Sequence, residues 1–214
     1  MAVLTIRQQL YRTLKQRILD GVYPPGAHLN IDIIAREQGV SNSPLREAMT
    51  LLVKDRLVEN RPNAGMYVIE ITPQLYRELV DTINTWIVGA YCLCLKYGKT
   101  ECLLALMEER LRALKKVIRR GTDRERIFAI LDFQRCFVTA TENTVFISSF
   151  GSEFDRLCLA YYYNHLGREI DWDINVQRAA TIIDAVKSGL VDTVSDMIWT
   201  WSVPHFEANQ IPEE

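Results

Sequence analysis

Apolar residues recur at intervals of three and four along the first 55 residues, which is the spacing of one face of an α-helix. The pattern predicts three short amphipathic helices, over residues 5–20, 31–38 and 42–55. Gly21 ends the first helix, and Gly39 ends the second in the manner of a left-handed cap. Only a few polar residues separate the second and third helices, which is typical of a helix-turn-helix.

Alternating apolar and polar positions follow the third helix. They predict short strands over residues 57–59 and 66–70, with a turn at residues 61–65 between them. Three helices and such a hairpin make a winged helix-turn-helix, in which the second helix of the motif enters the major groove of DNA. We predict that this first domain spans residues 1–72.

The remainder, residues 73–214, is predicted to be a second and entirely helical domain. Its helices are expected at residues 73–98, 100–120, 123–141, 144–164, 173–188 and 190–208. The second domain has no strand alternation and no glycine-rich phosphate loop. The predicted fold class is mainly α, with an N-terminal winged helix-turn-helix of three helices and a β-wing, followed by an all-α helical bundle of about six helices.

Composition supports a folded chain but does not reveal its partner. The chain is 48% hydrophobic and its net charge is −2, so it can bury a substantial core. Residues 1–72 hold nine Lys/Arg and seven Asp/Glu. This balance is only mildly basic and would not by itself indicate a nucleic-acid-binding domain.

The cysteines and the hydropathy pattern indicate in which cellular compartment the protein is expected. Five cysteines lie among apolar helical residues without a C-x-x-C pair: Cys92, Cys94, Cys102, Cys136 and Cys158. We expect reduced, packed thiols in a cytoplasmic protein, with a redox sensor built on Cys92 and Cys94 as the alternative. Neither a secretory signal nor an uncharged run of ~20 residues is found, so no membrane contact is expected.

The tip of the third helix carries the first candidate DNA-binding residues. Ser41, Asn42 and Ser43 precede Pro44, and a proline is tolerated in the first turn of a helix because its missing N–H would have no partner there. Either serine is a candidate cap. Arg46 lies one turn further and can pair with a phosphate or with guanine. An ordinary solvated arginine is the alternative.

Asn63 and Gly65 lie at the predicted tip of the wing, where glycine permits a tight turn and a close backbone approach. Any hairpin turn favours the same residue types, so the pattern alone leaves their role open. Several basic residues are candidates for further phosphate contacts, with a solvated surface as an equal alternative for each: Arg7, Arg12, Lys15, Arg17 and Arg61.

Three segments resemble the GntR family of bacterial transcription regulators: ILDGVYPPGAHL (residues 18–29), IIAREQGVSNSPLREAM (33–49) and LLVKDRLVENRPNAGMYV (51–68). These segments contain the turn prolines, the helix-turn-helix and the wing glycine in the same order as in the family. The resemblance implies that Arg46 and the wing contact DNA. The family usually has arginine where this chain has Asn42, and asparagine can pair with adenine, so we predict a different operator.

The helical remainder resembles the FadR-type, or FCD, effector-binding domain of that family, best in FQRCFVTATEN (residues 133–143) and DAVKSGLVD (184–192). The resemblance implies a small metabolite as effector, often a carboxylate, together with a divalent metal and a homodimer. The family's metal-ligand positions fall on Ile130, Gln134, Ala179 and close to Trp201. Apart from a weak amide oxygen at Gln134, none is a suitable ligand, so we expect no metal and no other cofactor.

The same region is the predicted effector pocket, with Arg178 as an additional polar group: Ile130, Gln134, Arg178, Ala179 and Trp201. An apolar lining favours a larger or neutral ligand over a small dicarboxylate. Two alternatives remain open. In the first, the aromatic residues of this region only pack in the core or at the dimer interface. In the second, the domain has lost effector binding and only dimerises.

The sequence therefore predicts a homodimeric transcriptional regulator that binds a double-stranded DNA operator and responds to a small-molecule effector. A ligand-independent, dimeric architectural DNA-binding protein with a degenerate effector domain is the alternative. An enzyme is not expected, because no nucleophile–base pair, carboxylate pair or metal cluster has a sensible spacing in the sequence.

Overall fold

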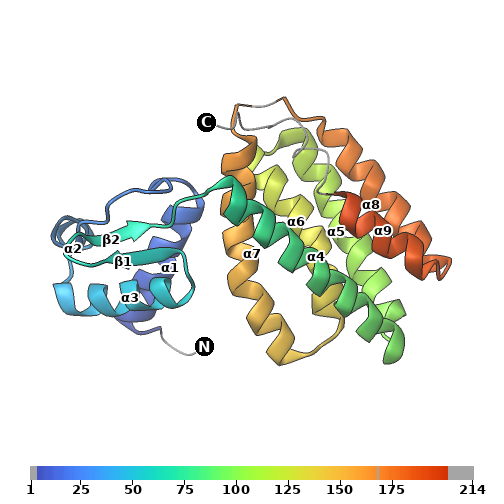
Figure 1. Cartoon of the computed structure of the whole chain (residues 1–214), viewed down its shortest axis with the longest axis horizontal. Coiled ribbons are helices and arrows are strands. Elements are labelled where there is room, and N and C mark those ends of the chain that lie inside the picture. Colours follow the sequence, from blue (N-terminus) through green and yellow to red (C-terminus); the bar gives the residue numbers. More distant parts are fainter. Residues whose placement is uncertain (1–3, 168, 202–214) are drawn as a thin grey trace.

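The computed structural model describes residues 4–167 and 169–201, and within them the predicted fold class is confirmed (Figure 1). Three helices and a hairpin form a first part, which we call the head: α1 Ile6–Leu19, α2 Ile31–Gln38, α3 Asn42–Lys54, β1 Val58–Arg61 and β2 Gly65–Val68. Helices alone form the second part, which we call the bundle: α4 Pro73–Lys96, α5 Thr100–Arg120, α6 Asp123–Ala140, α7 Thr144–His165, α8 Trp172–Lys187 and α9 Val191–Trp201.

Polar caps fix where several helices begin. Thr5 caps α1 and Thr122 caps α6, each in a reciprocal box with the Gln or Glu three residues further on. Asn30 accepts a hydrogen bond from the amide of Ile33 at the start of α2. Gly39 ends α2 with a φ of 63°, which is the left-handed cap that the sequence predicts.

The core of the head lies between α1 and α3. Leu14 and Ile18 of α1 and Leu45 and Met49 of α3 are at most 1% exposed. Their spacing is the apolar stripe that the sequence shows, so each helix presents its predicted face to the other. Leu159 of α7 joins the same cluster from the bundle.

The two strands of the wing pair antiparallel, with Val58 opposite Val68 and Arg61 opposite Gly65. The predicted bounds, 57–59 and 66–70, are therefore wrong: the hairpin continues closer to its turn and ends before Ile69. Asn63 explains the difference, because its φ of 60° lets the chain reverse over three residues and leaves Arg61 and Gly65 free to pair.

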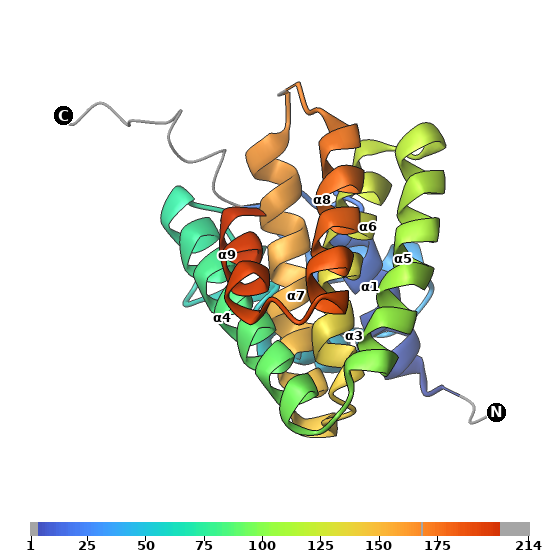
Figure 2. The same cartoon turned by 90° about the vertical axis from the view of Figure 1, so that its right-hand side faces the viewer.

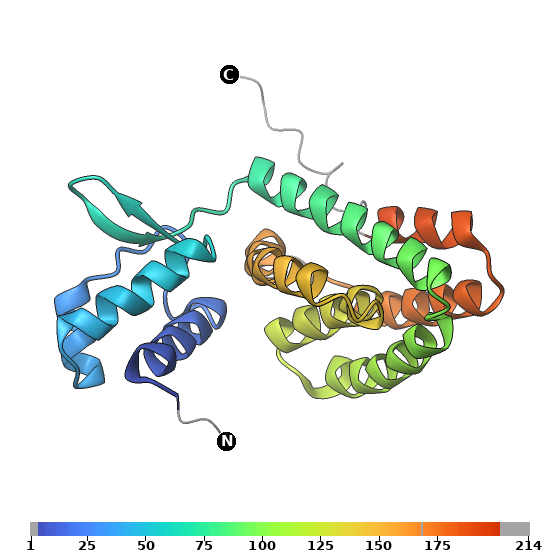
Figure 3. The same cartoon turned by 90° about the horizontal axis from the view of Figure 1, so that it is seen from below.

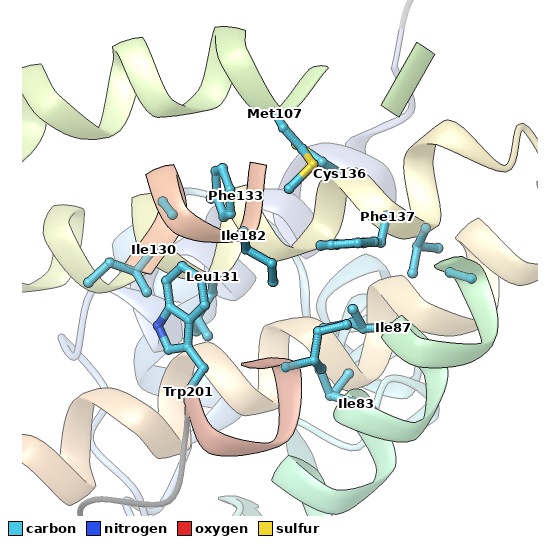
Figure 4. Packing of buried hydrophobic residues seen from close by; sticks show 14 of the residues in the cluster. Ile83, Ile87, Met107, Ile130, Leu131, Phe133, Cys136, Phe137, Ile182 and Trp201 are labelled. Atoms are coloured by element: carbon cyan, nitrogen blue, oxygen red, sulfur yellow. The ribbon is translucent and has the colours of Figure 1, made fainter. Parts of the chain in front are cut away.

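Helix α6 lies in the middle of the bundle, in contact with α4, α5, α7 and α8, while α9 packs on α4 and α8 (Figure 2). Figure 4 shows Phe133 and Phe137 of α6 in this core, with Ile83 and Ile87 of α4 beside Phe137. The last predicted helix is observed to Trp201, and residues 202–208 of that prediction lie outside the described part of the chain. No described helix is long and apolar enough to cross a lipid bilayer.

A partly buried ion pair joins the head to the bundle. Lys15 of α1 lies 2.5 Å from a carboxylate oxygen of Asp155 in α7 and 3.2 Å from one of Asp55, which follows α3. Burial by itself lowers the pKa of Lys15, but the hydrogen bonds and charge interactions with Asp155 and Tyr11 together outweigh it, and the net shift is upward. Burial raises the pKa of Asp155, and Lys15 opposes that shift. Lys15 therefore stays charged at neutral pH.

Arg124 of α6 makes the second junction contact. Its guanidinium donates to the backbone carbonyl of Leu19, at the end of α1, and lies 3.5 Å from the ring centre of Tyr162. Gly21 makes this contact possible, because its φ is 74° and a Cβ there would overlap the guanidinium. The head is thus held against the bundle at α1, as Figure 1 shows for α1 and α7.

The cysteines yield a direct test of the bundle core. Burial raises the pKa of Cys94 to about 11 and that of Cys136 to about 12, whereas Cys92 is exposed. Because the thiolate is the reactive form, we expect Cys92 to react fastest with a thiol reagent at pH 8 and the other two to react only on unfolding. Stopped-flow labelling measures this. Cys92→Ser should remove the fastest phase and Cys136→Ser should retain it; labelling of Cys94 or Cys136 in the folded Cys92→Ser variant would contradict the packing.

Candidate nucleic-acid interface

The amino-terminal end of α3 lies on the side of the head remote from the bundle. Figure 3 shows α3 running from this far end toward the bundle, with the wing on the same outer side. The opposite end of α3 leads to Arg56, which lies 3.2 Å from Glu153 of α7. The tip of α3 is therefore free to approach a large partner without moving the bundle.

The predicted tip residues are all exposed. Ser41 occupies the N-cap position, as predicted, but its side chain makes no capping hydrogen bond, and neither does that of Ser43 in the described part of the chain. Pro44 has no N–H, so the amides of Asn42 and Ser43 are the ones left unbonded in the first turn. No acidic residue lies in this turn. Such an end attracts an anion such as a phosphate.

Asn42 is held by a neighbouring helix. Its side-chain amide donates to the carboxylate of Asp32, in the first turn of α2, over 2.7 Å. The amide has a second hydrogen, and its carbonyl oxygen is not used by this bond. The bond therefore orients Asn42 without using up its capacity to pair with another molecule.

Arg46 is exposed one turn further along α3 and has no acidic partner among the described residues. Its neighbour Glu47 pairs instead with Arg7 of α1, over 3.6 Å. The buried residues on either side, Leu45 and Ala48, fix the orientation of α3. Arg46 is thus held on the outer face by packing, with its charge directed to solvent.

The wing tip lies beside the same face. Asn63 is exposed in the left-handed region, and Gly65 is exposed with a φ of 99°. A Cβ at Gly65 would lie 3.1 Å from the ring of His28, which itself packs against the tilted ring of Tyr67 in β2 at a centroid distance of 4.9 Å. Both the backbone angle and this close ring favour glycine at position 65.

Most other basic candidates of the head have acidic partners. Arg17 pairs with Glu37 over 3.4 Å. Arg61 pairs with Glu59 and Glu70 and covers the ring of Tyr67. Lys15 is a correction: it lies at the junction with the bundle, half buried against Asp155, and not on a surface open to phosphates. No local pattern reveals this, because the partner is on a distant helix.

The predicted effector-pocket residues lie in the bundle core. Ile130, Gln134, Ala179 and Trp201 are all buried. Figure 4 shows Trp201 between Ile130, Leu131 and Ile182, close to the ring of Phe133. The two ring centroids are 5.7 Å apart. An indole therefore packs where the resemblance places the last metal-ligand position.

Hydrogen bonds hold that indole in place. The Trp201 ring N–H donates to the side-chain oxygen of Asn175 over 3.1 Å, and Arg178 donates to the Trp201 carbonyl over 3.2 Å. The structure thus brings Arg178 and Trp201 together, as predicted for one region. Among the described residues, no group of three or more His, Cys, Asp or Glu side chains is placed to hold a metal ion.

Comparison with known families assigns both parts of the chain. The family described as bacterial regulatory proteins, gntR family, matches residues 6–68, and the FCD domain matches residues 99–200. Together the two matches take in more than three quarters of the sequence. The chain belongs to the GntR family. Its head thus corresponds to the gntR family of bacterial regulatory proteins, and most of its bundle corresponds to an FCD domain.

Curated relatives of this GntR protein match it over about half of its length or less. The uncharacterized HTH-type transcriptional regulator YdhC of Bacillus subtilis is 32% identical over 115 residues, 54% of this chain and 51% of the relative. The HTH-type transcriptional repressor RspR of Escherichia coli is 34% identical over 67 residues, 31% of this chain and 29% of that protein. The chain spans about half, or less, of the length of these relatives.

Solved structures share the fold of both parts. E. coli McbR/YncC superimposes with a TM-score of 0.72 at 19% identity, over 94% of this chain and 96% of that one. A putative GntR transcriptional regulator from Rhodococcus sp. RHA1 superimposes with a TM-score of 0.68 at 20% identity, over 91% and 92%. At such identities the likeness concerns the arrangement of head and bundle alone.

Arg46 offers the sharpest test of the interface. Arg46→Ala removes an exposed, unpaired charge, so we expect at least about a tenfold loss of DNA affinity, or ~1.4 kcal/mol, with an unchanged melting temperature. Fluorescence anisotropy with a duplex selected from a random pool measures it. Arg119→Ala is the control, since it removes an exposed arginine from α5 in the bundle. Equal losses in the two variants would show that total charge, and not the tip of α3, sets the affinity.

Proposed function

We propose that this GntR protein binds a double-stranded operator through the tip of α3 and the wing, and that a small-molecule effector in its FCD domain modulates the binding. The exposed end of α3 carries the first half of the proposal: its first-turn amides are unbonded and Arg46 is without an acidic partner among the described residues. The match to the FCD domain over residues 99–200 supports the second half.

Each predicted residue has a role in this proposal. The Ser41 and Ser43 hydroxyls and the first-turn amides contact backbone phosphates and so set the depth of α3 in the major groove. Arg46 contacts a base edge or a phosphate next to it. Asn63 and Gly65 bring the backbone of the wing tip close to the flanking DNA.

Asn42 is proposed to read adenine. The second hydrogen of its amide and its free carbonyl oxygen match N7 and N6 of adenine in the major groove, while Asp32 fixes the orientation. An arginine at this position would instead favour guanine. The Asn42→Arg variant is therefore expected to change which base pair is preferred, not only how tightly DNA binds.

Two copies are proposed to bind together. A homodimer with two-fold symmetry would place two α3 tips in successive major grooves, about 34 Å apart, on an inverted repeat. A ligand would then regulate binding by favouring one spacing of the two heads over another.

A second function rests on one observation. The buried Trp201 and its hydrogen bonds occupy the region where the resemblance places metal and effector. That packing favours a ligand-independent, architectural DNA-binding dimer. Operator affinity measured across a metabolite collection separates the two candidates: a compound that changes both the melting temperature and the operator affinity supports regulation, and its absence supports the architectural role.

Selection of bound duplexes from a random pool tests the proposed function. We expect an inverted repeat with an adenine in each half-site, bound by a species of about twice 24.7 kDa. The affinity should fall steeply as salt rises, because phosphate contacts release counterions. The measurements are sequencing of the selected pool, light scattering and anisotropy at several salt concentrations. A monomer that enriches no sequence would contradict the proposal.

A further inference from the structure

A cavity of about 540 Å³ lies where the head meets the bundle. Its wall comes from the end of α1 and from α5, α6 and α7, so neither the head nor the bundle forms it alone. The predicted effector-pocket residues around Trp201 are not part of its lining. A volume of this size suits a small organic molecule.

The inner surface of the cavity is mainly apolar and partly aromatic. Leu19 of α1, Val117 of α5, Phe128 of α6 and Tyr162 of α7 contribute to it. Phe128 is 47% exposed, which is unusual for a residue of its size, and its ring meets that of Phe154 in a T-shaped contact. Almost half of its surface therefore remains open to a ligand.

Acidic side chains make up most of the charge of the lining: Asp20, Glu125, Asp132 and Asp155. Asp155 is paired with Lys15, and Asp132 with Arg110 over 3.1 Å. Asp20 is exposed at the end of α1, where only the amide of Gln16 donates to its side chain, over 2.8 Å. A carboxylate on the rim therefore remains available for a cationic group.

The basic residue in the lining is engaged elsewhere. Arg124 donates to the Leu19 carbonyl, and its guanidinium covers the ring of Tyr162. An anionic ligand would meet carboxylates without a free cation to offset them. A ligand with an apolar body and an ammonium group would find the ring of Phe128 for its body and a carboxylate at the rim for its charge.

We propose that this junction cavity binds a small hydrophobic amine, with its ring or chain against Phe128 and Tyr162 and its ammonium group at Asp20. The site would be an effector site of the proposed regulator, and that role rests on the proposed function. Because its wall includes Leu19 and Asp155, which also hold the head through Arg124 and Lys15, an occupant contacts the residues that set the position of α3.

Calorimetry with three ligands tests the site. The ligands share a phenyl ring and differ in their polar end group: phenethylamine, phenethyl alcohol and phenylacetate. We expect saturable binding of the amine below about 1 mM, weaker binding of the alcohol and no binding of the acid. Equal binding of all three, or none by the amine, would overturn the proposal.

Variants at exposed positions locate the bound amine without endangering the fold. Ala113→Phe places a ring in the mouth of the cavity and Phe128→Ala removes one, and each should weaken phenethylamine at least about fivefold. Asp20→Asn should weaken it about threefold. The matched controls are Ala105→Phe and Asp81→Asn, which lie on exposed faces of α5 and α4 outside the cavity. An amine that binds Ala113→Phe and Ala105→Phe alike occupies another site.

The proposed effect of the amine on operator binding is measured separately. Saturating phenethylamine should change the operator affinity of the wild-type chain at least about threefold and leave that of Ala113→Phe unchanged. If the amine binds without such a change, the proposed effect on operator binding is wrong, whereas the proposed amine site still stands. A chain that binds no selected duplex even without amine would overturn the proposed function, while the calorimetry would still decide on the cavity.

Discussion

The packing of α3 on α1 is the constraint on which the proposed DNA recognition depends. Leu45, Ala48, Met49 and Leu52 are fully buried along one stripe of α3. Successive residues of a helix are rotated by about 100°, so the same stripe that buries Leu45 turns Arg46 outward. A different register would bury that charge without a partner, which is costly. The apolar core of the head therefore determines which polar groups the tip of α3 exposes.

The junction extends this constraint to the bundle. A partly buried ion pair is weak evidence for stability, since desolvation offsets much of the attraction, but its geometry is specific. Lys15 is shared between Asp55 of the head and Asp155 of α7, and Arg124 reaches a backbone carbonyl that only a nearby glycine leaves accessible. These contacts give the head a defined position relative to the bundle. A ligand that fits one such position better than another would change the spacing of two heads in a dimer.

Local patterns in the sequence predicted the local structure well. The periodicity of α1 and α3, the left-handed cap at Gly39 and the proline at the start of α3 each depend on residues close together in the chain. The bounds of the wing strands were wrong because they depend on the backbone angle of one residue, Asn63, which strand alternation does not reveal.

The long-range contacts could not be predicted in this way. The sequence around Lys15 indicates only a surface cation, and the sequence around its partner Asp155 indicates only an acidic residue on a helix. Their pairing depends on the position of α7 beside α1. The cavity at the junction follows from the docking of two independently patterned parts, so no motif marks it. The roles of the α3 tip and of the region around Trp201 stay predictions, because they concern molecules that the chain binds and not the chain itself.

Hydrogen exchange of the 214-residue chain with and without its selected duplex shows whether the tip of α3 contacts DNA. We expect slower exchange at the amides of residues 41–43, 45 and 46 and at those of the wing turn, residues 63–65, with no change in the middle of α5, because DNA would cover only the outer side of the head. Protection confined to the bundle, or absent from the tip of α3 while DNA is bound, would contradict the account.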